Sequence, residues 1–273
     1  IRFRREKDFL FARGSVDAKS PLLALIFAAL KKEYEDLKIK IACVVGEESE
    51  DPGISKIDKN FLKSDFAIFG EPSNLTGVVI GYRGRLALRV LCKAQRAHAS
   101  IQTYNPIKEV VNFLKKIDGL RDNKEGDSIV NSLTVNPVMI KGGIANNVIP
   151  DLCEALVDVR IPINTSIQEI KDEIKNLVSP SMIIEWLSET DAVLANKESL
   201  LVFFFKKSIA KNLKVSPRLL IKAGSSDMNY YAKNFSLNCV SYGPGDPRYE
   251  HSNEEKISIK DYLKSIDIIS SVL

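Results

Sequence analysis

Carboxylate side chains follow apolar segments at several separate places in this sequence, and one histidine follows another such segment near the C-terminal end. The acids are Asp17 after residues 9–12, Glu47 and Glu48 after 39–45, and Glu71 after 66–70, and the histidine is His251 after 237–242. Four acids and an imidazole at junctions between strands and loops are what a site for two divalent metal ions requires. Because such a site activates water, the pattern indicates hydrolysis of an amide or ester bond.

Each of these residues also has an interpretation without chemistry. Asp17 directly precedes a predicted helix, where a negative charge is favourable for the helix dipole. The acidic stretch 47–51 is compatible with a solvated loop, Glu71 with a turn residue, and His251 with a surface position in a loop rich in Gly and Pro. Taken together they favour a common site, because all of them map to one edge of one predicted sheet.

The elements that position these residues alternate between strands and helices. A strand over Phe9–Ala12 is followed by a helix, with Ser20 as its N-cap and Pro21 as its first residue. The apolar run Ile39–Val45 predicts a strand buried on both faces, and another short strand ends at Glu71. This alternation predicts an α/β layered domain, with functional residues at the carboxyl ends of its strands.

The pattern changes after about Arg83, and it returns to the α/β type after about Thr190. The middle part has half-buried strands at 86–93, 128–140 and 154–161 and helices at 105–119 and 166–178, and the last part has helices at 199–212 and 258–273 around a strand at 237–242. We therefore predict an α/β domain over 1–83 and 190–273, with a smaller α+β domain inserted at 84–189.

Composition excludes several classes of protein. The 273 residues are 45% hydrophobic and 27% charged, as in ordinary globular proteins, and the net charge of +4 comes from basic and acidic residues mixed throughout. A nucleic-acid partner is therefore not expected. The four cysteines have no CxxC spacing, which is typical of reduced thiols in a cytoplasmic protein. We see no signal peptide and no apolar run near the length of about 20 residues that spans a bilayer.

Four segments resemble, in order, the metal motifs of the M20 family of co-catalytic zinc peptidases and deacylases. They are ARGSVDAKSPL, VVGEESEDPG, FGEPS and YEHSNE. That family includes carboxypeptidase G, acetylornithine deacetylase and succinyl-diaminopimelate desuccinylase. The segments GEPSNLTGVVIGYRGRL and KAGSSDMNYYA are most similar to hydrolases that release lysine or ornithine from an amino-group carrier protein. The resemblance implies an aminopeptidase/carboxypeptidase-like α/β domain with an inserted ferredoxin-like lid that also mediates dimerisation.

Carried over by position, the resemblance assigns a role to each acid. Asp17 would bridge two zinc ions, Glu48 and His251 would complete one metal, and Glu71 would hold the other. Glu47 would be the general base that takes a proton from water and returns it to the leaving amine. In the intact enzymes of this family the implied cofactor is two Zn²⁺ per subunit, with Co²⁺ as an alternative.

The beginning of the sequence departs from the family pattern. The family has a His-x-Asp pair upstream of the Asp17 motif, and its histidine binds the second metal. The sequence begins with Ile1-Arg2-Phe3 and has no such pair, so we expect the N-terminal portion to be lacking and this form to be poorly active.

Substrate-binding residues are also implied by the resemblance. His98 would reach from a neighbouring subunit to the scissile carbonyl, although the residue taken alone favours an inert histidine at a strand end. Asn146 and Arg160 match a segment that binds a substrate carboxylate. The alternative for Arg160 is a structural ion pair with Asp158 or Asp151. Gly224 and Ser225 match a loop that binds the substrate backbone. The alternative there is an ordinary turn, with Asp227 capping the next helix.

The sequence therefore predicts a cytoplasmic, homodimeric, zinc-dependent hydrolase of C–N bonds with no membrane partner. The substrate implied most directly is lysine or ornithine linked to a carrier protein. Alternatives are a small-molecule deacylase of the acetylornithine or succinyl-diaminopimelate type, or a dipeptidase. A non-catalytic metal-binding or partner-binding protein is the alternative from another class.

Overall fold

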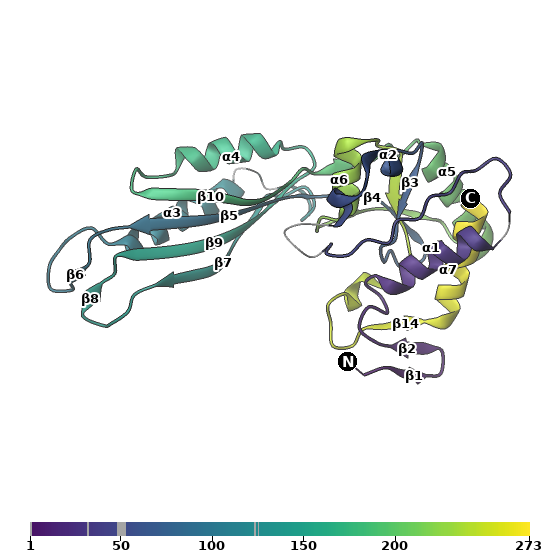
Figure 1. Cartoon of the computed structure of the whole chain (residues 1–273), viewed down its shortest axis with the longest axis horizontal. Coiled ribbons are helices and arrows are strands. Elements are labelled where there is room, and N and C mark those ends of the chain that lie inside the picture. The colour runs from purple at the N-terminus through teal and green to yellow at the C-terminus, as the bar shows by residue number, and fades with distance from the viewer. Residues whose placement is uncertain (1, 32, 48–52, 123, 125) are drawn as a thin grey trace. The chain divides into compact units, whose positions relative to one another are not determined.

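The structure, a computed structural model, describes residues 2–31, 33–47, 53–122, 124 and 126–273 (Figure 1). The chain divides into two compact units. The first unit consists of Ile1–Gly81, Leu194–Ile221 and Ser226–Leu273, and the second consists of Tyr82–Val193 with Lys222–Ser225. In the sequence, the second unit is thus inserted into the first. No helix in the described ranges is long and apolar enough to cross a bilayer.

The first unit contains two sheets. One is antiparallel and joins the two ends of the chain, in the order β1 (Arg4–Glu6), β2 (Phe9–Phe11) and β14 (Lys256–Ser258). The other has the order β11 (Val193–Leu194), β4 (Gly77–Tyr82), β13 (Cys239–Ser241) and β3 (Ala67–Phe69), with β12 (Arg218–Lys222) paired to β4. Strand β13 is parallel to β3 and antiparallel to β4. This mixed sheet carries the loop that contains Glu71.

The helices of the first unit surround these sheets. They are α1 (Lys19–Leu30), α2 (Lys59–Leu62), α5 (Leu200–Leu213), α6 (Asp227–Asn234) and α7 (Ile259–Val272), with short 3₁₀ turns η1 (Gly53–Lys56) and η2 (Pro247–Tyr249). Helix α7 packs against both α1 and α5 (Figure 1). Ser199 and Ser258 cap α5 and α7 by accepting bonds from the amides of Val202 and Asp261. Both helices begin where the sequence predicted.

Two local predictions for this unit are wrong. Helix α1 begins at Lys19, so Ser20 lies inside the helix, and the residue at the N-cap position is Ala18, which makes no side-chain cap. The segment Ile39–Val45 forms no strand, and most of its residues are exposed. A strand needs a partner for its backbone groups, and the described residues provide no strand that pairs with this segment. Apolar composition alone was therefore not sufficient.

The second unit has a βαββαβ order and one four-stranded antiparallel sheet. Its elements are β5 (Gly84–Lys93), α3 (Pro106–Asp122), β7 (Thr134–Gly142), β9 (Leu152–Ile161), α4 (Ile167–Asn176) and β10 (Met182–Thr190), and the sheet order is β10-β5-β9-β7. A separate short pair joins β6 (Ala97–His98) to β8 (Val148–Ile149). This arrangement is the predicted ferredoxin-like domain. The predicted strand over 128–140 in fact begins at Thr134, and β10 was not predicted.

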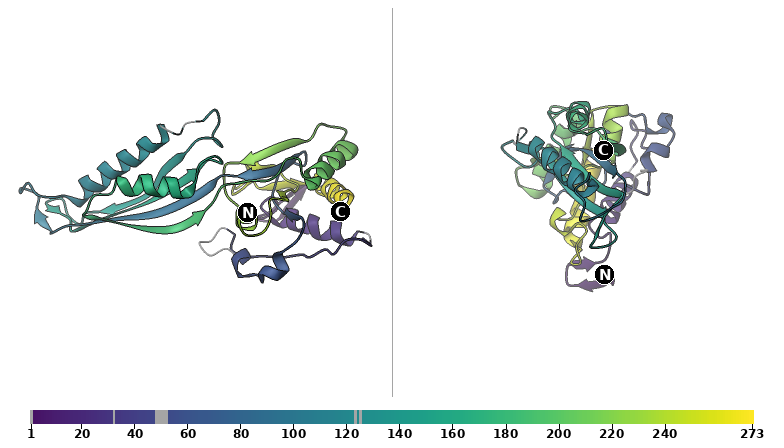
Figure 2. Two further views of the ribbon diagram at one scale, coloured as in Figure 1. Left: turned by 90° about the horizontal axis from the view of Figure 1, so that it is seen from above. Right: turned by 90° about the vertical axis from the view of Figure 1, so that its left-hand side faces the viewer.

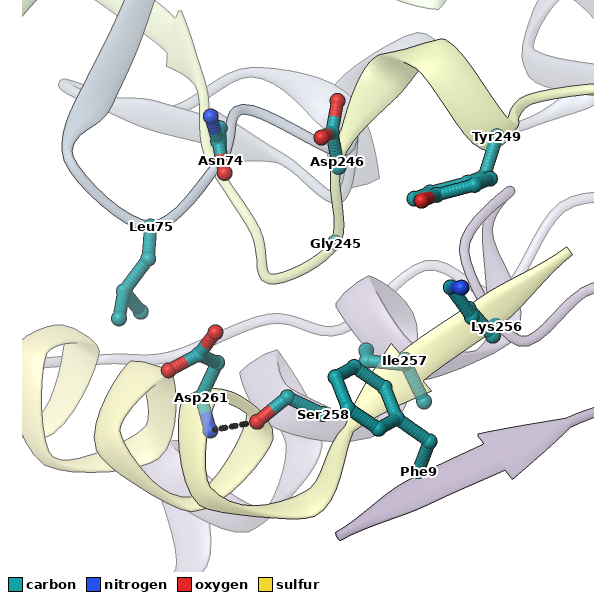
Figure 3. Close-up of a pocket in the computed structure, with 10 residues that line it drawn as sticks. All are labelled: Phe9, Asn74, Leu75, Gly245, Asp246, Tyr249, Lys256, Ile257, Ser258 and Asp261. Carbon is teal, nitrogen blue, oxygen red and sulfur yellow. Dashed lines mark hydrogen bonds between the residues drawn. The ribbon is translucent and has the colours of Figure 1, made fainter. Parts of the chain in front are cut away.

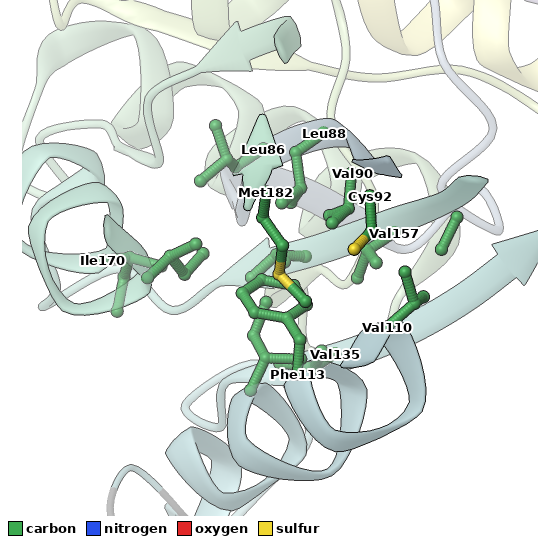
Figure 4. Packing of buried hydrophobic residues seen from close by; sticks show 14 of the residues in the cluster. Leu86, Leu88, Val90, Cys92, Val110, Phe113, Val135, Val157, Ile170 and Met182 are labelled. Atoms are coloured by element: carbon green, nitrogen blue, oxygen red, sulfur yellow. The ribbon is translucent and has the colours of Figure 1, made fainter. Parts of the chain in front are cut away.

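Helices α3 and α4 cover the same face of this sheet (Figure 2). Alternate residues of β5, such as Leu86 and Leu88, are fully buried there against Phe113 of α3 and Ile170 of α4 (Figure 4). The other residues of β5 and β9 point to the opposite face, because successive side chains of a strand alternate. That opposite face carries charged groups, including Arg85 and Arg160.

Candidate active site

Asp17 is held in place by a buried carboxylate from the far end of the chain. It lies between β2 and α1, in a loop whose backbone amides point toward Glu255. The Glu255 side chain is 1% exposed and accepts hydrogen bonds from the amides of Gly14 (3.0 Å), Val16 (2.9 Å) and Asp17 (3.1 Å). Arg13 also donates to it at 3.3 Å. Glu255 therefore fixes the backbone from which the Asp17 side chain projects.

The structure brings Asp17 and His251 together. Nε2 of His251 lies 3.1 Å from Oδ2 of Asp17, and their side chains are 64% and 24% exposed. His251 follows the turn η2, which is capped by Asp246, and has a left-handed backbone with φ of 56°. This local turn directs the imidazole back toward Asp17, although the two residues are far apart in the sequence.

The distance between Asp17 and His251 is compatible with both side chains binding the same zinc ion. Carboxylate oxygen and imidazole nitrogen are usual zinc ligands, and two atoms bound to one tetrahedral zinc at about 2.0–2.1 Å lie about 3.3 Å apart. The observed separation of 3.1 Å is close to that value. Across the described part of the chain, however, no group of three or more His, Cys, Asp and Glu side chains is placed to hold a metal.

Glu71 lies in a loop that packs against the start of α1. Gly243 lies against both segments, since a Cβ atom added to it would lie 2.7 Å from the Pro21 side chain and 2.9 Å from the Glu71 carbonyl oxygen. The amide of Ser73 donates to the Gly243 carbonyl at 3.1 Å, which ties the Glu71 loop to the segment after β13. Glu71 is half-buried. Its backbone is thus near the end of α1 that follows Asp17.

The predicted general base, Glu47, precedes the residue predicted to bind the metal, Glu48. Glu47 lies in an exposed turn, in a loop closed by the bond from the Gly53 amide to the Val45 carbonyl at 3.0 Å. Glu48 lies outside the described residues. Of the predicted acidic set, the structure therefore pairs Asp17 with His251 and leaves Glu47, Glu48 and Glu71 as predictions.

A pocket of about 280 Å³ opens beside the His251 loop in the first unit (Figure 3). Its lining includes Phe9, Tyr249, Lys256 and Asp261. The ammonium of Lys256 lies 4.8 Å from the centre of the Tyr249 ring and 5.6 Å from that of Phe9. None of the predicted metal ligands lines this pocket, so it is distinct from the Asp17–His251 pair.

His98 is an exposed residue of β6 in the second unit. The amide of Ser100 donates to its Nδ1 at 3.2 Å, and the Ser100 hydroxyl lies 2.7 Å from the same atom. Since Nδ1 accepts, the neutral ring carries its proton on Nε2 and can donate from there. The exposed Asn146 is far from His98 in the sequence but near it in space, because the Asn147 carbonyl accepts from the Ala99 amide at 2.8 Å.

Arg160 forms the ion pair with Asp158 that the sequence left open as an alternative. Its Nε donates to Oδ1 of Asp158 at 2.7 Å, while Nε of Arg85 donates to Oδ2 of the same carboxylate, also at 2.7 Å. Arg160 and Asp158 are two positions apart on β9 and so face the same side of the sheet. The Asp158 carboxylate is therefore shared by two arginines.

Arg83 holds the loop that precedes Gly224 and Ser225. Its side chain is 4% exposed and donates to the carbonyls of Ala223 (2.8 Å), Ile129 (3.0 Å) and Ser132 (3.2 Å). Burial lowers the pKa of Arg83, and the nearby charge of Arg160 lowers it further, while Asp158 has the opposite effect.

Helix α6 follows this loop, and its cap differs from the predicted one. Ser226 accepts from the Met228 amide in a capping box with Asn229, whereas Asp227 is the first helical residue. Burial raises the pKa of Asp227 to about 6.

Sequence reasoning missed Glu255, Arg83 and Arg85. Glu255 follows His251 by four positions and lies directly after the segment from which the histidine motif was recognised. The two arginines frame Gly84 at the start of a predicted strand. The sequence shows these charged residues but not their partners, because the partners lie far away in the sequence. The fold is needed to identify those partners.

Comparisons with known proteins agree with this architecture. The sequence profile of Peptidase family M20/M25/M40 matches residues 2–273. A "[LysW]-lysine/[LysW]-ornithine hydrolase" from Saccharolobus solfataricus is 30% identical over 269 residues, covering 96% of this chain and 75% of the relative. A protein of the same name from Sulfurisphaera tokodaii is 33% identical over 259 residues, covering 94% and 71%.

Solved structures show the same fold. An M20 family metallo-carboxypeptidase from Sulfolobus solfataricus superposes with a TM-score of 0.78 at 18% identity, covering 98% of this chain and 78% of its own. The aminopeptidase PepT from Bacillus cereus gives 0.79 at 16% identity, covering 99% and 75%. The predicted family and fold class are confirmed, and membership of this metallopeptidase family implies a divalent metal. The chain belongs to peptidase family M20/M25/M40 and is a hydrolase of amide or peptide bonds.

Proposed function

We propose that the protein releases lysine or ornithine from an amino-group carrier protein by metal-dependent amide hydrolysis. The observation that carries this proposal is the identity of about a third with hydrolases of that name over nearly the whole chain. The Asp17–His251 pair supports a metal site in the first unit. We further propose a cytoplasmic homodimer with two zinc ions per subunit.

In this proposal the predicted residues of the first unit bind the metal and transfer protons. Asp17 and His251 would hold the metal, with Glu48 and Glu71 as the further ligands. A bound divalent ion lowers the pKa of water and polarises the scissile carbonyl. Glu47 takes a proton from the attacking water and passes it to the leaving amine.

The second unit would contribute to substrate binding. Nε2 of His98, from a neighbouring subunit, donates a hydrogen bond to the carbonyl oxygen as negative charge develops there. Arg160 binds the carboxylate of the amino acid that is released, with Asn146, Gly224 and Ser225 around the substrate.

The test compares substrates on the zinc-loaded protein. Release of the free amino acid is measured from a carrier-linked lysine, from N-acetylornithine (as ornithine) and from dipeptides. We expect carrier-linked lysine to be hydrolysed at least about 100-fold more efficiently than the others, a difference of about 2.7 kcal/mol. Equal or faster hydrolysis of N-acetylornithine would assign the protein to the small-molecule deacylases instead.

A variant of Glu47 tests the proposed base. Glu47→Gln keeps the size of the side chain but cannot accept the proton, so turnover should fall about 10³-fold while zinc content stays the same. Metal analysis of the purified variant checks the second part. Near-normal turnover would remove Glu47 from the mechanism.

A further inference from the structure

The open face of the sheet in the second unit carries two arginine clusters with opposite charge balance. Arg85 and Arg89 lie on this face of β5, four residues apart. Arg89 faces two carboxylates, Glu154 and Glu185, each at 3.0 Å. Arg85 instead shares a single carboxylate with another arginine. The cluster around Arg89 thus has one positive and two negative charges. The cluster around Arg85 has two positive charges and one negative charge.

The shared carboxylate is Asp158, and each of its oxygens has its own arginine. Oδ2 accepts from Nε of Arg85 and Oδ1 accepts from Nε of Arg160, both at 2.7 Å. A further contact from Nη2 of Arg160 to Oδ2 is longer, at 3.5 Å. Asp158 is therefore bound on both sides, and neither arginine engages it through a full bidentate fork.

This geometry leaves guanidinium nitrogens for a second anion. Both terminal nitrogens of Arg85, and Nη1 of Arg160, have no acceptor within the chain that the structure describes. The side chains are 35% and 26% exposed, so a small solute can reach them. Buried Arg83 lies near this pair, and the charges of both Arg160 and Asp158 affect its pKa. The single carboxylate of Asp158 is therefore shared by the two positive charges of Arg85 and Arg160.

We propose that Arg85 is a specificity-determining residue for substrates that carry a carboxylate. Because Arg85 takes one oxygen of Asp158, the single negative charge of that carboxylate is divided between Arg85 and Arg160, and the two guanidinium groups together bind the carboxylate of the amino acid portion. This inference rests on the proposed function, in which Arg160 binds that carboxylate. The alternative of a purely structural Arg160–Asp158 pair predicts no role for Arg85 in binding.

The first experiment compares two probes on the zinc-loaded protein. They are Nα-(γ-glutamyl)-L-lysine and the same compound with the lysine carboxylate converted to a carboxamide. Arg85→Met should raise KM about 10-fold for the first probe, with kcat within about twofold, and should leave KM for the carboxamide unchanged. Arg85→Lys keeps the charge and should restore KM for the first probe to within about threefold of the parent protein.

Arg89→Met is the matched control, because it removes the same side chain from the same strand and face. It should change KM for neither probe, since that cluster has an excess of negative charge. An Arg85→Met variant that behaves like Arg89→Met, or that affects both probes equally, overturns the proposal.

A second experiment needs no turnover and separates this inference from the proposed function. In protein labelled with ¹⁵N-arginine, L-lysine should shift the Nε–Hε signals of Arg85 and Arg160 but not that of Arg89, and L-lysinamide should shift none. Shifts with lysine in a protein that hydrolyses neither probe would support the carboxylate site and contradict the proposed reaction. Absence of shifts at Arg85 would contradict the site whatever the turnover.

Discussion

Replacing Glu255 by glutamine should open the loop that carries Asp17. The carboxylate of Glu255 accepts three backbone amides through its two oxygens, from Gly14, Val16 and Asp17. A glutamine keeps one acceptor oxygen and places an NH₂ donor where the other oxygen was, so at least one amide loses its acceptor and faces a donor. Hydrogen bonds to a charged group contribute about 1.5–3 kcal/mol each. We therefore expect a loss of about 3 kcal/mol in the local opening free energy.

Hydrogen exchange measured by mass spectrometry on peptides that cover residues 13–17 reports this opening directly. A loss of about 3 kcal/mol corresponds to exchange faster by about 150-fold, because every 1.4 kcal/mol is a factor of ten. Zinc affinity should also fall by about 10–100-fold, as is usual when the support of a metal ligand is removed.

Two internal controls accompany this variant. Glu254→Gln changes the exposed neighbour and should leave exchange unaffected. Trp186, the single tryptophan, lies in the second unit, so unfolding followed by its fluorescence should be unchanged in Glu255→Gln. If amide exchange of residues 13–17 in Glu255→Gln stays within threefold of that in the parent protein, Glu255 does not hold this loop.

Three further predictions concern other sites. Asp227 has a pKa raised to about 6 by burial, above its unfolded value of about 3.9, so its ionisation destabilises the fold as pH rises through this range. Asp227→Asn should therefore raise unfolding free energy by about 2 kcal/mol at pH 8 and by almost nothing at pH 4, and an equal gain at both pH values would contradict this origin. Leu88→Ala in the buried cluster should lower the stability of the second unit by about 3 kcal/mol in urea unfolding followed by Trp186 fluorescence, whereas Val138→Ala, 64% exposed on β7, should not. Asp17→Asn should weaken zinc binding by more than about 100-fold in metal titrations, and unchanged affinity would exclude Asp17 as a ligand.

The sequence was most informative where a local pattern determines structure. The helices predicted at 199–212 and 258–273 correspond to α5 and α7, where the structure shows Ser199 and Ser258 as caps, and the change of pattern in the middle part predicted the α+β domain. The Asp158–Arg160 pair was also foreseeable, because residues two apart on a strand share a face. The pairing of Asp17 with His251 rested on motif resemblance, since no local rule connects residues so far apart.

The features that could not be predicted from the sequence depend on partners far away along the chain. Ile39–Val45 has the composition of a buried strand, but composition does not supply the neighbouring strand that would bury it. Glu255 reads as a surface acid in an acidic loop and becomes buried only because β14 pairs with β2. Arg85 acquires its role through Asp158, which lies on a strand that follows β5 only after a helix and another strand.

The antiparallel pairing of Phe9–Phe11 with Lys256–Ser258 has a consequence for biosynthesis. The inserted unit is almost continuous in sequence, so its sheet and helices can form once residue 193 has left the ribosome. The hairpin that contains Phe9–Phe11 and the Asp17 loop must wait until residues 255–258 are translated, because their partner strand and the Glu255 carboxylate come from that segment. Domains generally fold as units during synthesis. Folding of the nascent chain should therefore proceed from the inserted unit outward, and the Asp17 loop should be among the last parts to acquire its native shape.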